Sequence, residues 1–247
     1  MNKKKVFILA LAVCLIAILS MSTLAWFNAN DSVKNDFMFD DTNNDGTPDF
    51  MVNIFETGED ANIGGKEYLH VAPGAVLDKD PTVKNEGDYA MYTRVIVTLD
   101  NASTWIAISD KYSLVENDNL ILEEMVDINA NWTRFELPVY NTTADTLTYV
   151  YYYNDSVDAD DTTASLFTKV TIPTAPQQDD MIFDDDMFSI TVKADAIQSD
   201  NIITATTTLV NNSEAYTAFS IANWDAGSEY PQPATEPATE TTEATEA

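Results

Sequence analysis

The chain has 247 residues, 45% of them hydrophobic, so it is long enough to bury the core of one domain with an elaboration. It carries 41 acidic residues against 12 basic ones, a formal net charge of −29. Such a surface repels nucleic acid and anionic lipid headgroups, so we expect neither as a partner. It favours solubility or cation binding, and a merely well-solvated surface explains the same excess.

Residues 1–25 have the plan of a secretory signal peptide. Three lysines precede a long apolar run, and small residues follow up to Ala25. Thr23 and Ala25 would fill the −3 and −1 positions of a cleavage site. The run is also long enough for a retained transmembrane anchor, which stays the alternative. Removal of the leader takes away three lysines and leaves 41 acidic and 9 basic residues, a net charge of −32. It also removes Cys14, the single cysteine, so the mature chain forms no disulfide.

An acidic loop follows at residues 40–49. Oxygen-bearing residues occupy positions one, three, five, seven and nine of a calcium-type loop, and a glycine takes the sharp turn at position six; they are Asp41, Asn43, Asp45, Thr47 and Asp49. Position twelve is Val52 rather than the glutamate of an EF-hand. The loop is therefore similar to the Asp-x-Asn-x-Asp-Gly loops of thrombospondin-type repeats, with Asp40 or Glu56 as further ligands. The alternative is a polar turn that holds no ion.

The most informative stretch runs from Pro73 to Leu99 and predicts turn, strand, turn, strand, that is, an antiparallel hairpin. Pro73-Gly74 and residues 85–88 have turn chemistry. Pro81 lacks an amide donor, so it belongs at an edge or at the start of its strand. The last strand alternates between two faces: Met91, Thr93, Val95, Val97 and Leu99 on one, and Tyr92, Arg94, Ile96 and Thr98 on the other.

This stretch resembles the TasA and camelysin group of secreted Gram-positive surface and biofilm matrix proteins, which are exported with a SipW-type signal peptidase. The resemblance rests on Pro-Gly, then Lys-Asp-Pro-Thr-Val-Lys-Asn-Glu-Gly-Asp, then Tyr-x-Arg-Val-x-Val. Residues 147–173 and Val192–Gln198 agree with it, so that it covers residues 1–225. It implies a jelly-roll arrangement of the strands and cleavage of the leader close to Ala25.

Short alternating segments recur along the rest of the chain, separated by Asn, Asp, Gly and Pro: Phe37 and Phe39; Phe50, Val52 and Ile54; Phe135, Leu137 and Val139; Leu147, Tyr149, Tyr151 and Tyr153; Leu166 to Ile172; Phe188 to Ala194. This pattern predicts an all-β, antiparallel β-sandwich over residues 26–228, with one or two short helices. One helix is expected near Ser213–Asn223, with Ser213 as its N-cap. Residues 229–247 form a Pro/Thr/Glu tract that predicts a disordered tail.

Catalysis finds little support. His70 is the single histidine, so the His-Glu-x-x-His motif of a zinc peptidase is absent, and so is a Gly-x-Ser-x-Gly elbow. We therefore expect no enzyme. The acidic clusters at 155–161 and 179–186 lack the spacing of a dedicated loop; solvated turns are expected, with weak cation binding as the alternative. Four tyrosines could face a ligand, but packing is their expected role: Tyr149, Tyr151, Tyr152 and Tyr153.

The family resemblance implies assembly, because its subunits join by inserting an N-terminal segment, freed by signal cleavage, into the next subunit. The donor here would be residues 26–39, with Trp26, Phe27, Val33, Phe37 and Phe39 as anchors. The leading hypothesis is a secreted structural protein that forms head-to-tail homopolymers at the cell surface, free of membrane once cleaved, with signal peptidase and other matrix proteins as further partners. A non-polymerising, calcium-dependent adhesion module is the alternative, and a camelysin-like metallopeptidase is the third.

Overall fold

The computed structural model describes residues 26–30, 51–58, 65–69, 71–176, 187–200 and 202–226. These ranges are mostly β, with antiparallel sheets, as the sequence predicts. The strands are β1 (Trp26–Asn30), β2 (Val52–Phe55), β3 (Gly65–Leu69), β4 (Val76–Asp78), β5 (Thr82–Asn85), β6 (Met91–Asp100), β7 (Trp132–Thr133), β8 (Val139–Asn141), β9 (Thr146–Tyr153), β10 (Lys169–Thr171), β11 (Met187–Phe188) and β12 (Ile190–Gln198). The helices are α2 (Ala102–Tyr112), the 3₁₀ turn η1 (Asp118–Leu120), α3 (Ile121–Met125) and α4 (Glu214–Ile221).

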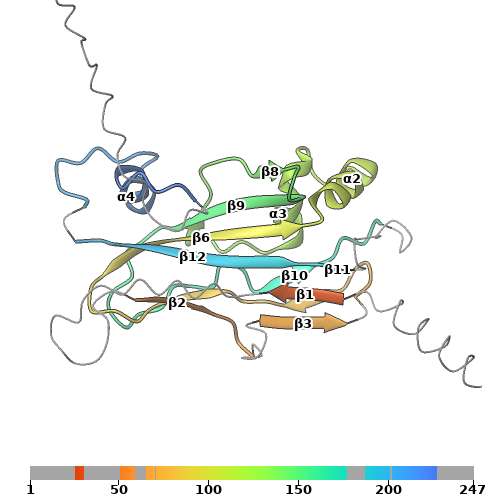
Figure 1. The fold of residues 1–247 in the computed structure, drawn as a ribbon, viewed down its shortest axis with the longest axis horizontal. Helices are drawn as coiled ribbons and strands as arrows, with labels where there is room; N and C mark the ends of the chain where they lie inside the picture. The colour runs from red at the N-terminus through yellow and green to blue at the C-terminus, as the bar shows by residue number, and fades with distance from the viewer. Residues whose placement is uncertain are drawn as a thin grey trace, which may run out of the picture.

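The largest sheet has the order β12-β6-β9-β7, with β8 also paired to β9. β6 is central: β12 pairs antiparallel with it from Met91 to Leu99, and β9 pairs with its other edge from Arg94 to Asp100. Figure 1 shows these strands running through the middle of the molecule, with α4 and α2 towards opposite ends of β9. β6 is rich in β-branched and aromatic residues, which favour a pleated and buried strand.

Three smaller sheets complete the described fold: β11-β1-β3, β10-β4 and β2-β5. In Figure 1, β1, β2 and β3 lie below β12. The predicted hairpin is wrong, because β5 pairs with β2 whereas β6 pairs with β9 and β12. The buried Asn85 explains the difference. Its side-chain amide donates to the carbonyls of Tyr89, Val157 and Asp158, so the turn after β5 is fastened to a distant segment and passes from one sheet to another.

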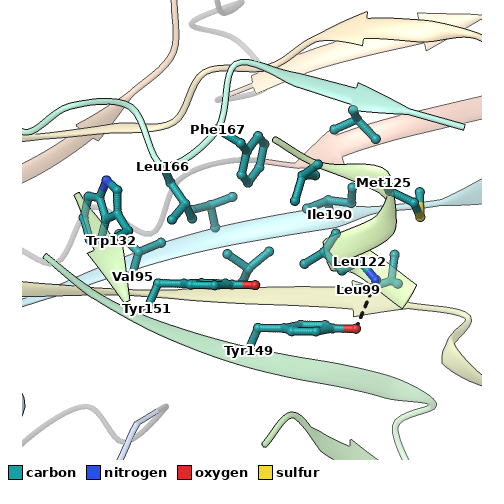
Figure 2. Packing of buried hydrophobic residues seen from close by; sticks show 14 of the residues in the cluster. Val95, Leu99, Leu122, Met125, Trp132, Tyr149, Tyr151, Leu166, Phe167 and Ile190 are labelled. Atoms are coloured by element: carbon teal, nitrogen blue, oxygen red, sulfur yellow. Dashed lines mark hydrogen bonds between the residues drawn. The ribbon is translucent and has the colours of Figure 1, made fainter. Parts of the chain in front are cut away.

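The main core covers one face of the large sheet. Val95 and Leu99 of β6, together with Tyr149 and Tyr151 of β9, are at most 1% exposed, so the face that they share in each strand, as the alternation predicts, packs in the core. Figure 2 shows these side chains packed with residues of α3 and of the segment before β10: Leu122, Met125, Leu166 and Phe167. Burying one such side chain stabilises the fold by about 1.5–3 kcal/mol, so this face dominates stability.

α4 covers part of the opposite face of the sheet, which is why β6 is buried on both sides. Ser213 is its N-cap, as predicted, and its Oγ accepts a hydrogen bond from the amide of Tyr216 at 3.2 Å. Phe219 packs with Trp224 and with Tyr152 of β9 in a second apolar cluster. This cluster fixes the last described segment of the chain against the sheet.

The expectation of one or two short helices is corrected, since the described ranges hold three α-helices. α2 buries Trp105 and Ile108 at helical spacing, so one face of this helix packs in the core. Its N-cap, Asn101, makes no side-chain cap bond; Asp145, from the turn before β9, accepts hydrogen bonds from the amide and hydroxyl of Ser103 instead. The hydrogen bonds that hold the first turn of α2 therefore come from a residue 42 positions away and cannot be read from the sequence around Asn101.

The strand predicted around Phe135 and Leu137 is also wrong. β7 ends at Thr133 and β8 begins at Val139, and Leu137 and Val139 are 68% and 66% exposed. Pro138 has no amide proton to offer a neighbouring strand, and the alternation before it therefore has no ladder to join.

Candidate assembly site

β1, the first part of the predicted donor segment, lies between two strands from distant parts of the chain. It pairs antiparallel with β3 along its whole length, with Asn28 opposite Glu67, and parallel with β11 through Trp26 and Phe27. Backbone pairing on both edges makes β1 the middle strand of its sheet. We call the space between β3 and β11, which β1 fills, the β1 slot.

The β11 side of the slot is fixed to the end of β6. Asp100, the last residue of β6, accepts hydrogen bonds from both the amide and the hydroxyl of Ser189, which separates β11 from β12. Phe188 of β11 is 2% exposed, and its ring meets the buried ring of Trp105 edge-on, with centroids 4.8 Å apart. These contacts set the point at which the chain leaves the β1 sheet and enters β12.

The β3 side of the slot is fixed to residues around the end of β4. Lys66 donates from Nζ to the carbonyl of Asp78 at 3.1 Å and to Oδ1 of Asp80 at 3.2 Å. The hydroxyl of Tyr68 donates to the same carbonyl of Asp78. The carboxylate of Asp80 also accepts a hydrogen bond from the amide of Thr57, just after β2. Two side chains of β3 therefore reach across to the neighbouring sheets.

Electrostatics at this side of the slot reflect burial. Burial and then the carboxylates of Glu56, Asp78 and Asp80 raise the pKa of Tyr68, so its hydroxyl stays a donor. Partial burial also acts to raise the pKa of the Asp80 carboxyl, but hydrogen bonds from Thr57 and Lys66 outweigh it, so that this pKa is lowered. Lys79 and Glu56 form an ion pair close by, with side chains 1% and 0% exposed. Removing either partner of such a buried pair destabilises the fold strongly, because the other charge is left buried without compensation. The pair therefore links the end of β2 to the end of β4.

Some of the predicted site residues lie within the described ranges, and the others lie outside them. Trp26 and Phe27 lie in β1, which pairs within its own chain. The other predicted anchors lie outside the described residues: Val33, Phe37 and Phe39. The whole predicted calcium loop, Asp41, Asn43, Asp45, Thr47 and Asp49, also lies outside them, as do His70, the acidic cluster at 179–186, the leader and the tail.

The acidic cluster at 155–161 lies on an exposed turn after β9. Within the described ranges, no group of three or more His, Cys, Asp or Glu side chains is placed to hold a metal ion. The expected packing role of the tyrosines of β9 is confirmed. Tyr149 and Tyr151 lie in the main core, Tyr152 packs against Phe219, and Tyr153 packs against Trp132.

Sequence reasoning missed a buried ion pair that joins two of the stretches behind the family resemblance. Arg94 donates from Nε to Oδ2 of Asp195 at 2.8 Å, and its Nη1 donates to the carbonyl of Trp224. Nη2 lies 2.8 Å from the same carboxylate oxygen and contributes to the ion pair without a hydrogen bond of its own. The guanidinium lies 4.2 Å from the ring centroid of Phe219. A polar pocket of about 140 Å³ opens beside it, at the edge of α4.

Comparisons with known proteins found no relative of this chain. Among the described helices, none has the length and hydropathy needed to cross a membrane. No protein-family model, no curated protein and no solved structure matches this chain.

Proposed function

We propose that this protein is a secreted structural protein of the extracellular matrix or cell surface that assembles head to tail into fibres by exchanging β1 between copies. In this proposal the leader is removed by signal peptidase and the domain is a β-sandwich of jelly-roll type. Further copies of the chain are the main partner, and other matrix proteins are additional ones. The protein performs no catalysis.

One observation carries the proposal: the predicted donor strand fills a slot that distant segments form, and it does so through backbone pairing on both edges. The same strand of a second copy offers identical pairing, so exchange between copies costs few contacts. If each copy gives its β1 to the next, the contact is head to tail and does not close, which produces a filament. The structure describes the strand in its own slot, and the proposal requires it to leave that slot before assembly.

A disulfide that locks β1 in its own slot tests the proposal. Asn28 and Glu67 are directly opposed in the β1–β3 ladder, and opposed positions in antiparallel strands are about 4.5–5.5 Å apart between Cα atoms, within the span of a disulfide. We expect the oxidised Asn28→Cys/Glu67→Cys variant of the mature chain to remain monomeric in light scattering and electron microscopy. Reduction frees β1, and fibres should then form.

The matched control places the same lock in a ladder away from the slot. Asn53 and Lys84 are directly opposed in β2 and β5. The Asn53→Cys/Lys84→Cys variant should assemble equally well oxidised and reduced. Fibres that form at the wild-type rate from the oxidised Asn28→Cys/Glu67→Cys variant would show that β1 is not exchanged.

A further inference from the structure

We infer that the β1 slot is held in shape by residues outside β1, so that it persists when β1 leaves. Asp100 and Trp105 hold the β11 side, and Lys66 and Tyr68 hold the β3 side. This inference rests on the proposed function, because it concerns how the slot receives the β1 of a second copy. It assigns these side chains a positioning role in assembly.

The β11 side is the better anchored. Asp100 uses both carboxylate oxygens on Ser189, one for the amide and one for the hydroxyl, and its own amide donates to the carbonyl of Ser189 at 3.2 Å. Three hydrogen bonds between one pair of residues leave little rotational freedom at the point where β11 continues into β12. Trp105 then holds Phe188, the next residue back, inside the core. Both anchors belong to β6 and α2 and not to the β1 sheet.

The β3 side is anchored by charge. Lys66 is 13% exposed and Asp80 26% exposed, so the ion pair between them is partly shielded from water. Asp80 is itself held by the amide of Thr57. Because Lys66 and Tyr68 both reach the carbonyl of Asp78, the last residue of β4, these contacts do not involve the strand that fills the slot.

A persistent slot has a kinetic consequence. An incoming strand that meets two fixed edges loses only its own conformational entropy, whereas a collapsed slot would have to order both edges as well. A subunit with weakened anchors still carries a normal β1, so it adds to a growing fibre. Its own slot then receives the next strand poorly. Such a subunit is therefore expected to terminate growth.

Hydrogen exchange tests the persistence of the slot without any assembly. Asn28→Pro in the mature chain disrupts the pairing of β1, because proline offers no amide donor and fixes φ. We expect the amide of Ser189 to exchange within about threefold of its wild-type rate in this variant, and about tenfold faster when Asp100→Ala is added, the factor expected for losing its carboxylate acceptor. Exchange of Ser189 at the rate of an unfolded chain in Asn28→Pro alone overturns the inference, whether or not the wild type forms fibres.

Seeded growth tests the consequence. Asp100→Ala or Lys66→Met, mixed at one part in ten with wild-type protein, should shorten fibres several-fold. Lys84→Met is the matched control for Lys66→Met, since it likewise breaks a partly exposed ion pair, between Lys84 of β5 and Glu86, which lies outside the β11-β1-β3 sheet. It should leave fibre length unchanged. If fibres are equally long with all three variants, the inference is overturned and the proposed function stays intact. If the wild type forms no fibres, the proposed function is overturned. In that case the hydrogen exchange of Ser189 still decides the inference.

Discussion

Arg94 and Asp195 are directly opposed in β6 and β12, 101 residues apart in the sequence, and form an ion pair whose side chains are 2% and 5% exposed. The pair lies under α4, where the guanidinium also holds the carbonyl of Trp224. It therefore fastens the large sheet and the segment after α4 to one point. It also gives a physical reason for Tyr-x-Arg-Val-x-Val and Val192–Gln198 to occur in one chain, since each supplies one charge of a buried pair.

Arg94→Met should lower the free energy of unfolding by about 3–5 kcal/mol at pH 7, because it leaves Asp195 buried without its cation. Adding Asp195→Leu should recover part of this loss, since the uncompensated charge is then gone. Urea denaturation of both variants measures the effect. Lys84→Met is the control: it breaks the more exposed pair with Glu86, and we expect at most about 1 kcal/mol. A loss for Arg94→Met no larger than that of the control would contradict the structural role of the pair.

The stability of the fold should depend on pH through Asp127. Burial acts to raise its pKa, but hydrogen bonds from the hydroxyl and amide of Thr168 and the amide of Lys169 outweigh it and lower the pKa below its ordinary 3.8. The ionised Asp127 carboxylate therefore contributes its full stabilisation at any pH above its ordinary pKa, and this stabilisation is lost as pH falls through its lowered pKa in the folded protein. Asp127→Ala should cost about 1–2 kcal/mol at pH 7 and progressively less below pH 3.8.

The contribution of Asp195 to stability should change with pH in the opposite direction. Burial raises its pKa, against the opposing effect of Arg94, so its contribution to stability falls as pH rises through the range between the ordinary and the raised value. Urea denaturation of Asp127→Ala and Asp195→Asn between pH 3 and pH 7 separates the two trends. Asp155→Ala, on an exposed turn, is the control and should give a difference below about 0.5 kcal/mol throughout. Parallel curves for the Asp127 and Asp195 variants would refute the assignment.

Local periodicity predicted the strands that are buried along their length. The alternation of Val95 and Leu99, or of Tyr149 and Tyr151, reports a face that meets a core, and the structure places all four there. Ser213 likewise announces α4 through a cap that lies within the helix's own sequence. These elements were predictable because the residues that decide them are neighbours in the chain.

The choice of partners was not predictable from one sequence. β5 and β6 are separated by a turn, yet each pairs with a strand elsewhere, because Asn85 fastens the turn to residues 157 and 158. The anchors of the β1 slot gave no signal for the same reason. The role of Asp100 arises only when Ser189, 89 residues later, is brought beside it.

Tyr149→Phe should destabilise the protein by about 1–3 kcal/mol. The Tyr149 hydroxyl donates to the half-buried carbonyl of Asn119 at 2.6 Å. It also accepts from the buried amide of Leu122 at 3.3 Å (Figure 2), so its removal leaves both groups without this partner. Chemical denaturation measures the loss. Tyr89→Phe, on a side chain that is 38% exposed, should change stability by less than about 0.5 kcal/mol. Equal effects of the two substitutions would mean that the hydroxyl of Tyr149 does not support the start of α3.

Calcium should stabilise the mature chain through the loop at residues 40–49, and Asp45→Asn should abolish that effect. Converging carboxylates repel one another until a cation binds, and a ligand that binds only the folded state at one hundred times its dissociation constant adds about 2.7 kcal/mol. Thermal unfolding with millimolar calcium, and again after chelation, measures the gain. Asp158→Asn, which removes one charge from an exposed turn, is the control and should keep it. If calcium raises the unfolding temperature equally in both variants, the ion binds through the general acidity of the surface and not through the loop. If calcium does not raise it in the wild type, the loop is a polar turn that holds no ion.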